Sequence, residues 1–332
     1  MCPVLPLLFS LCALAAPGPY LGQKLPGPRP EPFAPGLVAT GMPTRDITFS
    51  PDGRELYFRV NTSGFTHSAI LGCRLGGRGW SVPEVPAFAA DPRWRTLEPA
   101  ISPDGRRFYF VSDRPEDPAA LRPGPMGIWV MERRGEGWGP ARRLGPDING
   151  PDGSFRPCPV QGGALYFARD GADGLGSVWR AAPQGAGFAR AERLPEVVQA
   201  GRARYNPYVT PDEGCMILCA EGAPGAVGGL DYVVLFRDGR GRWSRPQNLG
   251  PLVNGAGHGE ISATLSPDGQ YLFFASERDE PGAFRPGEGL TRERLRALDA
   301  RPGRNGRQSI YWMEAGFLEA LRRSAVFPED SK

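Results

Sequence analysis

Residues 102–110 read Ser-Pro-Asp-Gly-Arg-Arg-Phe-Tyr-Phe, a tight-turn sequence followed by a short aromatic run. The same unit returns at residues 50–58 and 266–274, and two degenerate copies occupy residues 160–167 and 210–218. In such a turn, proline fixes the first position, aspartate hydrogen-bonds the local backbone, and glycine supplies the positive φ that closes the hairpin. Five copies spaced by roughly fifty residues, with strands alternating with Gly/Pro turns, predict an all-β, five-bladed β-propeller.

The two degenerate copies depart from the regular turn. Residues 160–163 read Val-Gln-Gly-Gly and lack the Pro-Asp pair. Residues 210–214 read Thr-Pro-Asp-Glu-Gly, which we interpret as a turn with one extra residue. We therefore expect both turns to differ in geometry from the three regular ones.

A second repeated position fixes the content of each blade. An aromatic residue opens a segment that ends 22 or 23 residues later at the next turn, and these residues are Trp80, Trp138, Phe188 and Trp243. Loops vary in length, so this constant spacing predicts an outer strand that crosses to the inner strand of the next blade. Each blade then has four strands, and we expect the tryptophans to pack between blades.

The last blade lacks its own outer strand, because residues 317–323 are helical in pattern. Residues 33–38, Phe-Ala-Pro-Gly-Leu-Val, match the outer-strand sequence Leu-Gly-Pro-Leu-Val at residues 249–253. We predict that an N-terminal strand completes the last blade. This closure would remove the two exposed sheet edges of an open array.

The predicted organisation begins with an uncharged leader. The first 23 residues carry no charged side chain, and their apolar run has the length of a signal-peptide core, too short for a spanning helix. Cleavage without lipidation at Cys12 is favoured because bulky Leu11 precedes that cysteine, which predicts a periplasmic or secreted protein. The boundaries are a signal peptide at 1–16, a linker at 17–28, the propeller at 29–316, an insertion at 279–308 with a helix begun by Thr291, and a C-terminal helix and tail at 317–332.

The repeat resembles a known family. The turn and its Leu-Tyr-Phe-type strand, followed by Ser112-Asp113-Arg114 or Ser276-Glu277-Arg278, look like the unit of TolB-like propellers of the WD-like repeat class found in bacterial envelope proteins. The resemblance covers about residues 30 to 316. It implies the propeller fold and an envelope location, and it does not specify a ligand, because propellers host many unrelated functions.

Composition narrows the class of partner. The chain has 46 Gly and 37 Pro, and its net charge of +3 is spread over mixed Arg, Asp and Glu. This pattern argues against nucleic-acid binding, and we expect a monomer without a membrane span. Four cysteines lie beyond the leader, Cys73, Cys158, Cys215 and Cys219. We interpret them as small buried side chains and leave their disulfide state open.

Polar residues gather at the starts of the inner strands and the ends of the second strands. Those at strand starts hold equivalent places, four residues before each turn. We expect these side chains to converge at the mouth of the central channel, on the face opposite the turns, and to bind a ligand there. The alternative is that they are solvated strand ends. The candidate residues are Asp46, Glu98, Arg156, Asn206, His258, Glu260, Arg59, Arg114, Arg169 and Arg278.

Three acidic groups, Asp46, Glu98 and Glu260, come from neighbouring blades. Two carboxylates at a suitable separation could cleave a glycoside, and the same groups could hold Ca²⁺ in the channel. The sequence contains no evident Ser/His/Asp order or phosphate loop, and the turn aspartates are interpreted as scaffold. The leading hypothesis is a non-catalytic propeller without a cofactor that binds an envelope protein or a glycan. The alternatives are a carbohydrate-active enzyme, either a glycoside hydrolase or a lyase, and a purely structural module.

Overall fold

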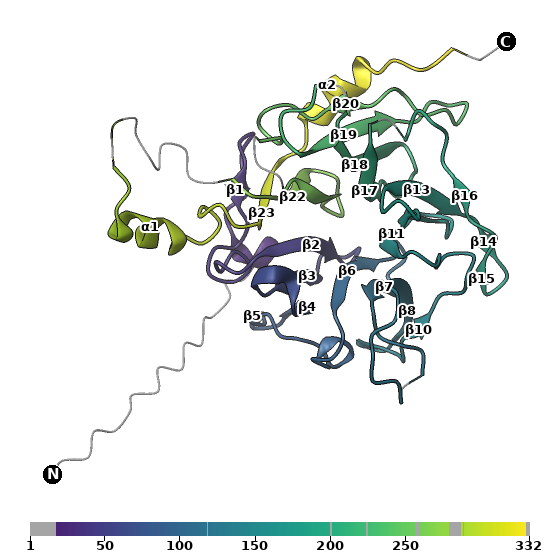
Figure 1. Cartoon of the computed structure of the whole chain (residues 1–332), viewed down its shortest axis with the longest axis horizontal. Coiled ribbons are helices and arrows are strands. Elements are labelled where there is room, and N and C mark those ends of the chain that lie inside the picture. Colours follow the sequence, from purple (N-terminus) through teal and green to yellow (C-terminus); the bar gives the residue numbers. More distant parts are fainter. Residues whose placement is uncertain are drawn as a thin grey trace.

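The chain is a ring of five antiparallel sheets around a central axis (Figure 1). The computed structural model describes residues 18–117, 119–199, 201–223, 225–255, 259–278, 287 and 289–329. Each blade has four main strands from the axis outwards, consecutive along the chain in all blades except blade 5, whose outer strand is β1, and this confirms the predicted all-β, five-bladed propeller.

The strands follow the repeat. Blade 1 holds β2 (Thr44–Phe49), β3 (Glu55–Asn61), β4 (Ser68–Gly76) and β5 (Gly79–Trp80). Blade 2 holds β6 (Thr96–Ile101), β7 (Arg107–Ser112), β8 (Gly127–Arg134) and β10 (Arg142–Arg143), with β9 (Gly137–Trp138) also paired to β8. Blade 3 holds β11 (Ser154–Pro159), β12 (Leu165–Asp170), β13 (Gly176–Ala181) and β16 (Glu192–Arg193), with the outer hairpin β14 (Pro183–Gln184) and β15 (Gly187–Phe188). Blade 4 holds β17 (Ala203–Val209), β18 (Cys215–Glu221), β19 (Leu230–Phe236) and β20 (Gln247–Asn248). Blade 5 holds β21 (Ile261–Leu265), β22 (Tyr271–Ser276), β23 (Ser309–Glu314) and β1 (Glu31–Pro32).

The N-terminal strand β1 completes blade 5 and closes the ring, as predicted. Glu31 pairs with Trp312 and Pro32 with Tyr311 in antiparallel register. The next residue, Phe33, is fully buried, and its ring packs edge-on against Phe273 at 5.1 Å. Strand β1, from the N-terminal part of the chain, and strand β23, from the C-terminal part, therefore lie side by side in one sheet.

The turns after the inner strands have the predicted chemistry. In the first, the Ser50 hydroxyl donates to Asp52 at 2.5 Å and accepts from the Glu55 N–H at 2.8 Å. The prediction of positive φ at the turn glycines is confirmed, because φ is 67° at Gly53, 70° at Gly105 and 72° at Gly269. We call the end of the propeller that carries these turns the turn face.

The two degenerate turns differ from each other. The prediction of an extra residue at 210–214 is wrong, because Glu213 takes the place of the glycine, at φ 58°, and the hydrogen bonds of the regular turn are kept. The turn at 160–163 does differ. Val160 N–H bonds to Ala164 O, one residue closer than in the regular turn, and two successive glycines there have φ 86°.

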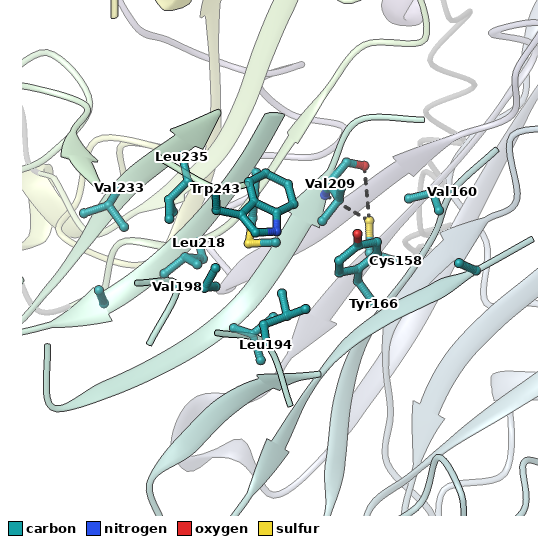
Figure 2. Packing of buried hydrophobic residues seen from close by; sticks show 14 of the residues in the cluster. Cys158, Val160, Tyr166, Leu194, Val198, Val209, Leu218, Val233, Leu235 and Trp243 are labelled. Atoms are coloured by element: carbon teal, nitrogen blue, oxygen red, sulfur yellow. Dashed lines mark hydrogen bonds between the residues drawn. The ribbon is translucent and has the colours of Figure 1, made fainter. Parts of the chain in front are cut away.

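The core lies between the blades. Figure 2 shows Trp243 packed among Leu218, Leu235 and Val209, at the junction of blades 3 and 4. Trp80 and Trp243 are buried, as predicted, whereas Trp138 is only partly buried. All four cysteines of the described region are buried free thiols, and Cys158 exchanges hydrogen bonds with the backbone of Val209.

Two terminal segments pack on the outside of the blades. Residues 18–23 lie within the stretch predicted as a linker, yet Leu21 is 4 % exposed and Tyr20 contacts the core between blades 5 and 1. At the other end, α2 (Phe317–Arg323) lies against blade 4 (Figure 1). The helix α1 (Arg292–Asp299) begins where predicted, since the Thr291 hydroxyl accepts from the Arg294 N–H. In the part of the chain that is described, no helix is long and apolar enough to cross a membrane.

Candidate functional site

The five equivalent residues at the inner strands share an unusual backbone. Each inner strand has a register shift against its neighbour at the same place, so one residue is left out of the ladder. That residue adopts a positive φ, which is uncommon for any residue other than glycine. The values are 58° at Asp46, 54° at Glu98, 48° at Arg156, 50° at Asn206 and 72° at Ser262. The bulge turns each of these side chains towards its counterparts in the other blades.

These five residues form one closed cycle of four hydrogen bonds and an ion pair, which we call the channel ring. Ser262 donates to Asp46 and accepts from the Asn206 amide at 2.8 Å. The same amide donates to Glu98 at 3.3 Å, and Glu98 also accepts from the backbone N–H of Arg156 at 2.6 Å. The cycle ends with Arg156 Nη1, which lies 3.9 Å from Asp46 Oδ1. Every blade contributes one member, so the ring joins all five blades at the axis.

The charges of the ring are balanced by arginines. Burial would raise the pKa of Asp46, but Arg45, Arg59 and Arg156 outweigh it and hold this pKa below its ordinary value. Burial, followed by the Asp46 charge, raises the pKa of Glu98. Arg59 lies 3.5 Å from Asp46, and burial lowers the pKa of its guanidinium to about 9. Asp46 is thus held as an anion by guanidinium groups, while Glu98 is the ring member that binds a proton more readily.

The ring does not lie at an open channel mouth, which corrects the sequence prediction. Its five members are between 0 % and 4 % exposed, so they close the channel from within. Sequence spacing located equivalent positions but could not show that the side chains reach one another across the axis.

The other candidate residues are placed apart from the ring, except Arg59. Glu260 is buried and accepts from Ser276 at 3.0 Å and from the Gly255 N–H at 3.2 Å. Arg114, Arg169 and Arg278 each lie over an aromatic ring of their own blade and donate to carbonyls of the segment that enters that blade. These three arginines therefore brace their blades. His258 lies outside the described residues.

A cavity of about 210 Å³ lies on the turn face, on the opposite side from the one that the sequence indicated. We call it the turn-face cavity. Arg156 is among its lining residues, so the cavity reaches the channel ring. Its walls come from residues two positions after the ring members and from the turn prolines: Thr48, Ala100, Cys158, Tyr208, Thr264, Pro51, Pro103, Pro211 and Pro267.

Sequence reasoning missed these wall residues. Side chains of a strand alternate between its two sides, so a residue two positions after a ring member again faces the axis. That rule could have found them, although they belong to four different residue types. The chemistry of the cavity is mainly apolar, with Arg156 Nη1 as a buried donor that has no hydrogen-bond partner among the described residues.

The arrangement offers little for acid/base chemistry or for a cation. A glycosidase needs two carboxylates that flank a substrate bond, and Asp46 and Glu98 are instead both bonded within the ring. Guanidinium groups occupy the surroundings where a hard cation would need oxygen ligands. Within the ranges that the structure describes, no cluster of three or more His, Cys, Asp or Glu side chains could hold a metal ion.

No family model and no curated protein sequence matches the chain. Solved structures match it as a fold. The structure of a BT0996 RGII complex has a TM-score of 0.52 at 10% identity and covers 88% of this chain and 92% of its own. TolB from Acinetobacter baumannii has a TM-score of 0.45 at 17% identity over 82% of this chain, which spans 57% of the length of that protein. A family 117 glycoside hydrolase, Zg3597 from Zobellia galactanivorans, has a TM-score of 0.46 at 12% identity, with 87% and 88% covered. At these identities the likeness concerns the fold alone.

Proposed function

We propose that this chain is a non-catalytic propeller that binds a protein segment through the turn-face cavity. The observation that carries the proposal is the contrast between the carboxylates of the channel ring and the turn-face cavity next to them. The carboxylates of Asp46 and Glu98 are buried and bonded, whereas the cavity beside them is open to an apolar group.

The walls of the cavity favour a protein ligand over a sugar. Four turn prolines and small side chains such as Ala100 and Thr48 line it. A site for a glycan needs several polar groups aimed at hydroxyls, while an apolar side chain needs only a matching shape. The buried guanidinium of Arg156 adds one donor, which suits a backbone carbonyl or a carboxylate of the same segment.

We also propose that residues 1–16 are removed as a signal peptide and that the protein acts in the periplasm or outside the cell. The uncharged leader and its short apolar run support this. Intact-mass measurement of the protein from a periplasmic or culture fraction tests it. Loss of about sixteen residues is expected, and an uncleaved chain would contradict export by this route.

The binding proposal is tested with the chain starting at Gly18. A phage-displayed random peptide library is panned on this protein, and a glycan array is probed with it in parallel. Peptides that bind the wild type should lose at least about tenfold in affinity to the variant Ala100→Trp, which fills the cavity. The control Ala182→Trp places the same side chain on an exposed residue of blade 3 and should change nothing.

Two outcomes would overturn this function. Peptides that bind Ala100→Trp as tightly as the wild type would show that the cavity is not the site. A glycan whose binding is lost in Ala100→Trp while no peptide binds would replace the protein ligand by a carbohydrate.

A further inference from the structure

The junctions between blades differ in what covers them. At three junctions, a tryptophan from the outer part of one blade shares a core cluster or a hydrogen bond with the second strand of the preceding blade. Trp80 belongs to one core cluster with Phe273, Trp243 to another with Tyr166, and Trp138 donates to the Tyr57 hydroxyl at 3.1 Å. The three junctions thus share a tryptophan but differ in the chain segment that covers them on the outside of the propeller.

The junction of blades 5 and 1 is covered by the N-terminal segment of the chain. The ring of Tyr20 lies 5.8 Å from that of Phe49 and 5.5 Å from those of Tyr271 and Trp312. Trp80 Nε1 donates to the Gly18 carbonyl at 2.7 Å. A short peptide segment with one aromatic side chain therefore completes this junction.

The C-terminal segment plays the same part beside blade 4. Leu318 of α2 belongs to the core cluster of Ile217. Further on, the Val326 carbonyl accepts from the Arg245 N–H at 2.8 Å. Two places on the outside of this propeller are thus already occupied by extended or helical peptide.

The junction of blades 1 and 2 has a groove instead. The blade 1–2 groove encloses about 880 Å³, and its apolar lining includes Tyr57, Phe88, Met131 and Trp138. Val85, 44 % exposed, stands among its lining residues. Figure 1 shows the two blades side by side, with β5 and β8 on their outer parts.

The side chains that line the groove include more basic than acidic groups, and one of the basic groups, Arg74, is paired with Glu55 at 3.4 Å. The lining holds three arginines, Arg74, Arg114 and Arg134, against one carboxylate, Glu84. Arg134 is exposed, so its guanidinium can meet an incoming group without breaking a buried contact. An excess of basic groups beside an apolar surface selects a partner with carboxylates next to an apolar side chain.

The indole of Trp138 is not arranged as a platform for a sugar. The guanidinium of Arg133 lies over this ring at 3.7 Å from its centroid, and the Phe108 ring lies 5.2 Å away. Arg133 is itself held by Glu55 at 2.8 Å. A sugar stacks on an open aromatic face, and the face under Arg133 is taken.

We propose that the blade 1–2 groove binds an extended segment of a partner protein, in which an aromatic or leucine side chain is flanked by acidic residues. The segment would occupy the groove as residues 18–22 occupy the neighbouring junction. The carboxylates would meet the arginines, Arg134 first. This site is separate from the turn-face cavity, and it does not depend on the function proposed for that cavity.

The test uses two fluorescein-labelled peptides built on the Tyr-Leu-Gly sequence of residues 20–22, one flanked by glutamates and one by lysines. Fluorescence anisotropy measures their binding to the chain that starts at Gly18. The glutamate peptide should bind and the lysine peptide should bind at least about tenfold more weakly. The variants Arg134→Glu and Val85→Asp should each weaken the glutamate peptide by about tenfold or more. Arg292→Glu, an equal charge change on exposed α1, should leave binding unchanged.

Both groove variants change exposed side chains, so unaltered melting curves are expected and exclude misfolding as the cause. The proposal is overturned if the glutamate peptide does not bind the wild type, or binds all variants equally. It is also overturned if only Ala100→Trp abolishes binding, which would move the peptide to the turn-face cavity. A glycan that binds in a manner sensitive to Arg134→Glu and Val85→Asp, with neither peptide binding, would assign the groove to carbohydrate.

Discussion

The backbone N–H of Arg156 donates a 2.6 Å hydrogen bond to Oε2 of Glu98, which joins blade 3 to blade 2 at the axis of the propeller. The other four contacts of the channel ring continue this link through Asn206, Ser262 and Asp46. Polar side chains that carry such bonds in a buried site specify how the blades meet. The role of these bonds is structural, and ligand binding falls to the turn-face cavity beside them, where Arg156 is the ring member that adds a donor.

The free energy of unfolding of the protein should depend on pH through Glu98 of the channel ring. Its pKa is raised above the ordinary 4.5, so the folded protein binds this proton more tightly than the unfolded chain does. The wild type therefore loses stability as pH rises above about 4.5, by about 1.4 kcal/mol for each unit by which the pKa is raised. Glu98→Gln cannot ionise and escapes this loss. The free energy of unfolding of Glu98→Gln relative to the wild type should thus increase from pH 4 to pH 7.

Urea unfolding at several pH values measures this difference. Asp46 has the opposite behaviour, since its lowered pKa adds stability above about 3.8 that is lost as pH falls, but it is present in both proteins. A difference that stays constant or decreases with pH would contradict the proton assignment of Glu98.

The turn glycines should be sensitive to any side chain. Gly53 has φ 67°, and a Cβ placed there meets nothing within 4 Å, so the only penalty is in the backbone. Gly53→Val should lower the free energy of unfolding by about 1–3 kcal/mol. The control is Gly187→Val, since Gly187 has equally open surroundings without a positive φ. Equal stability of the two variants in thermal unfolding would count against this explanation of the repeat.

Closure of the propeller by β1 should be needed for the protein to stay folded and free of aggregation. Starting the chain after Val38 removes β1, Phe33 and Tyr20, and exposes the β23 edge. We expect a lower melting temperature and aggregation, detected by calorimetry and size-exclusion chromatography. The chain that starts at Gly18 keeps all three elements and serves as the control. A monomer of unchanged melting temperature after the longer truncation would refute the closing role of β1.

Calcium should have no effect on stability. Guanidinium groups of Arg45, Arg59 and Arg156 already balance Asp46, so a divalent cation would add repulsion. Millimolar CaCl₂ or EDTA should shift the melting temperature by less than about 1 °C. A clear rise with calcium that saturates would identify a cation site.

The repeat made the fold predictable, and the site much less so. The Ser-Pro-Asp-Gly turns and the match of residues 33–38 to 249–253 are local patterns, and they led to the blade count and the closure. Glu213 was misjudged because a non-glycine residue at positive φ gives no signal in the sequence. Asp46 and Arg156 were chosen as equivalent residues, but their contact joins blades 1 and 3 across the axis, and spacing along a chain carries no such distance. The wall of the turn-face cavity was missed since Thr48, Ala100 and Tyr208 have nothing in common except their place.

Binding without catalysis is the central claim, and it is tested most directly by measuring glycan turnover and peptide binding on the wild type and Glu98→Gln together. We expect no turnover by either protein, and peptide affinities that agree within about threefold, because Glu98 is bonded inside the channel ring and does not line the turn-face cavity. Turnover of a glycan by the wild type that vanishes in Glu98→Gln, with glycan binding retained, would contradict it and establish acid/base catalysis by the ring carboxylates.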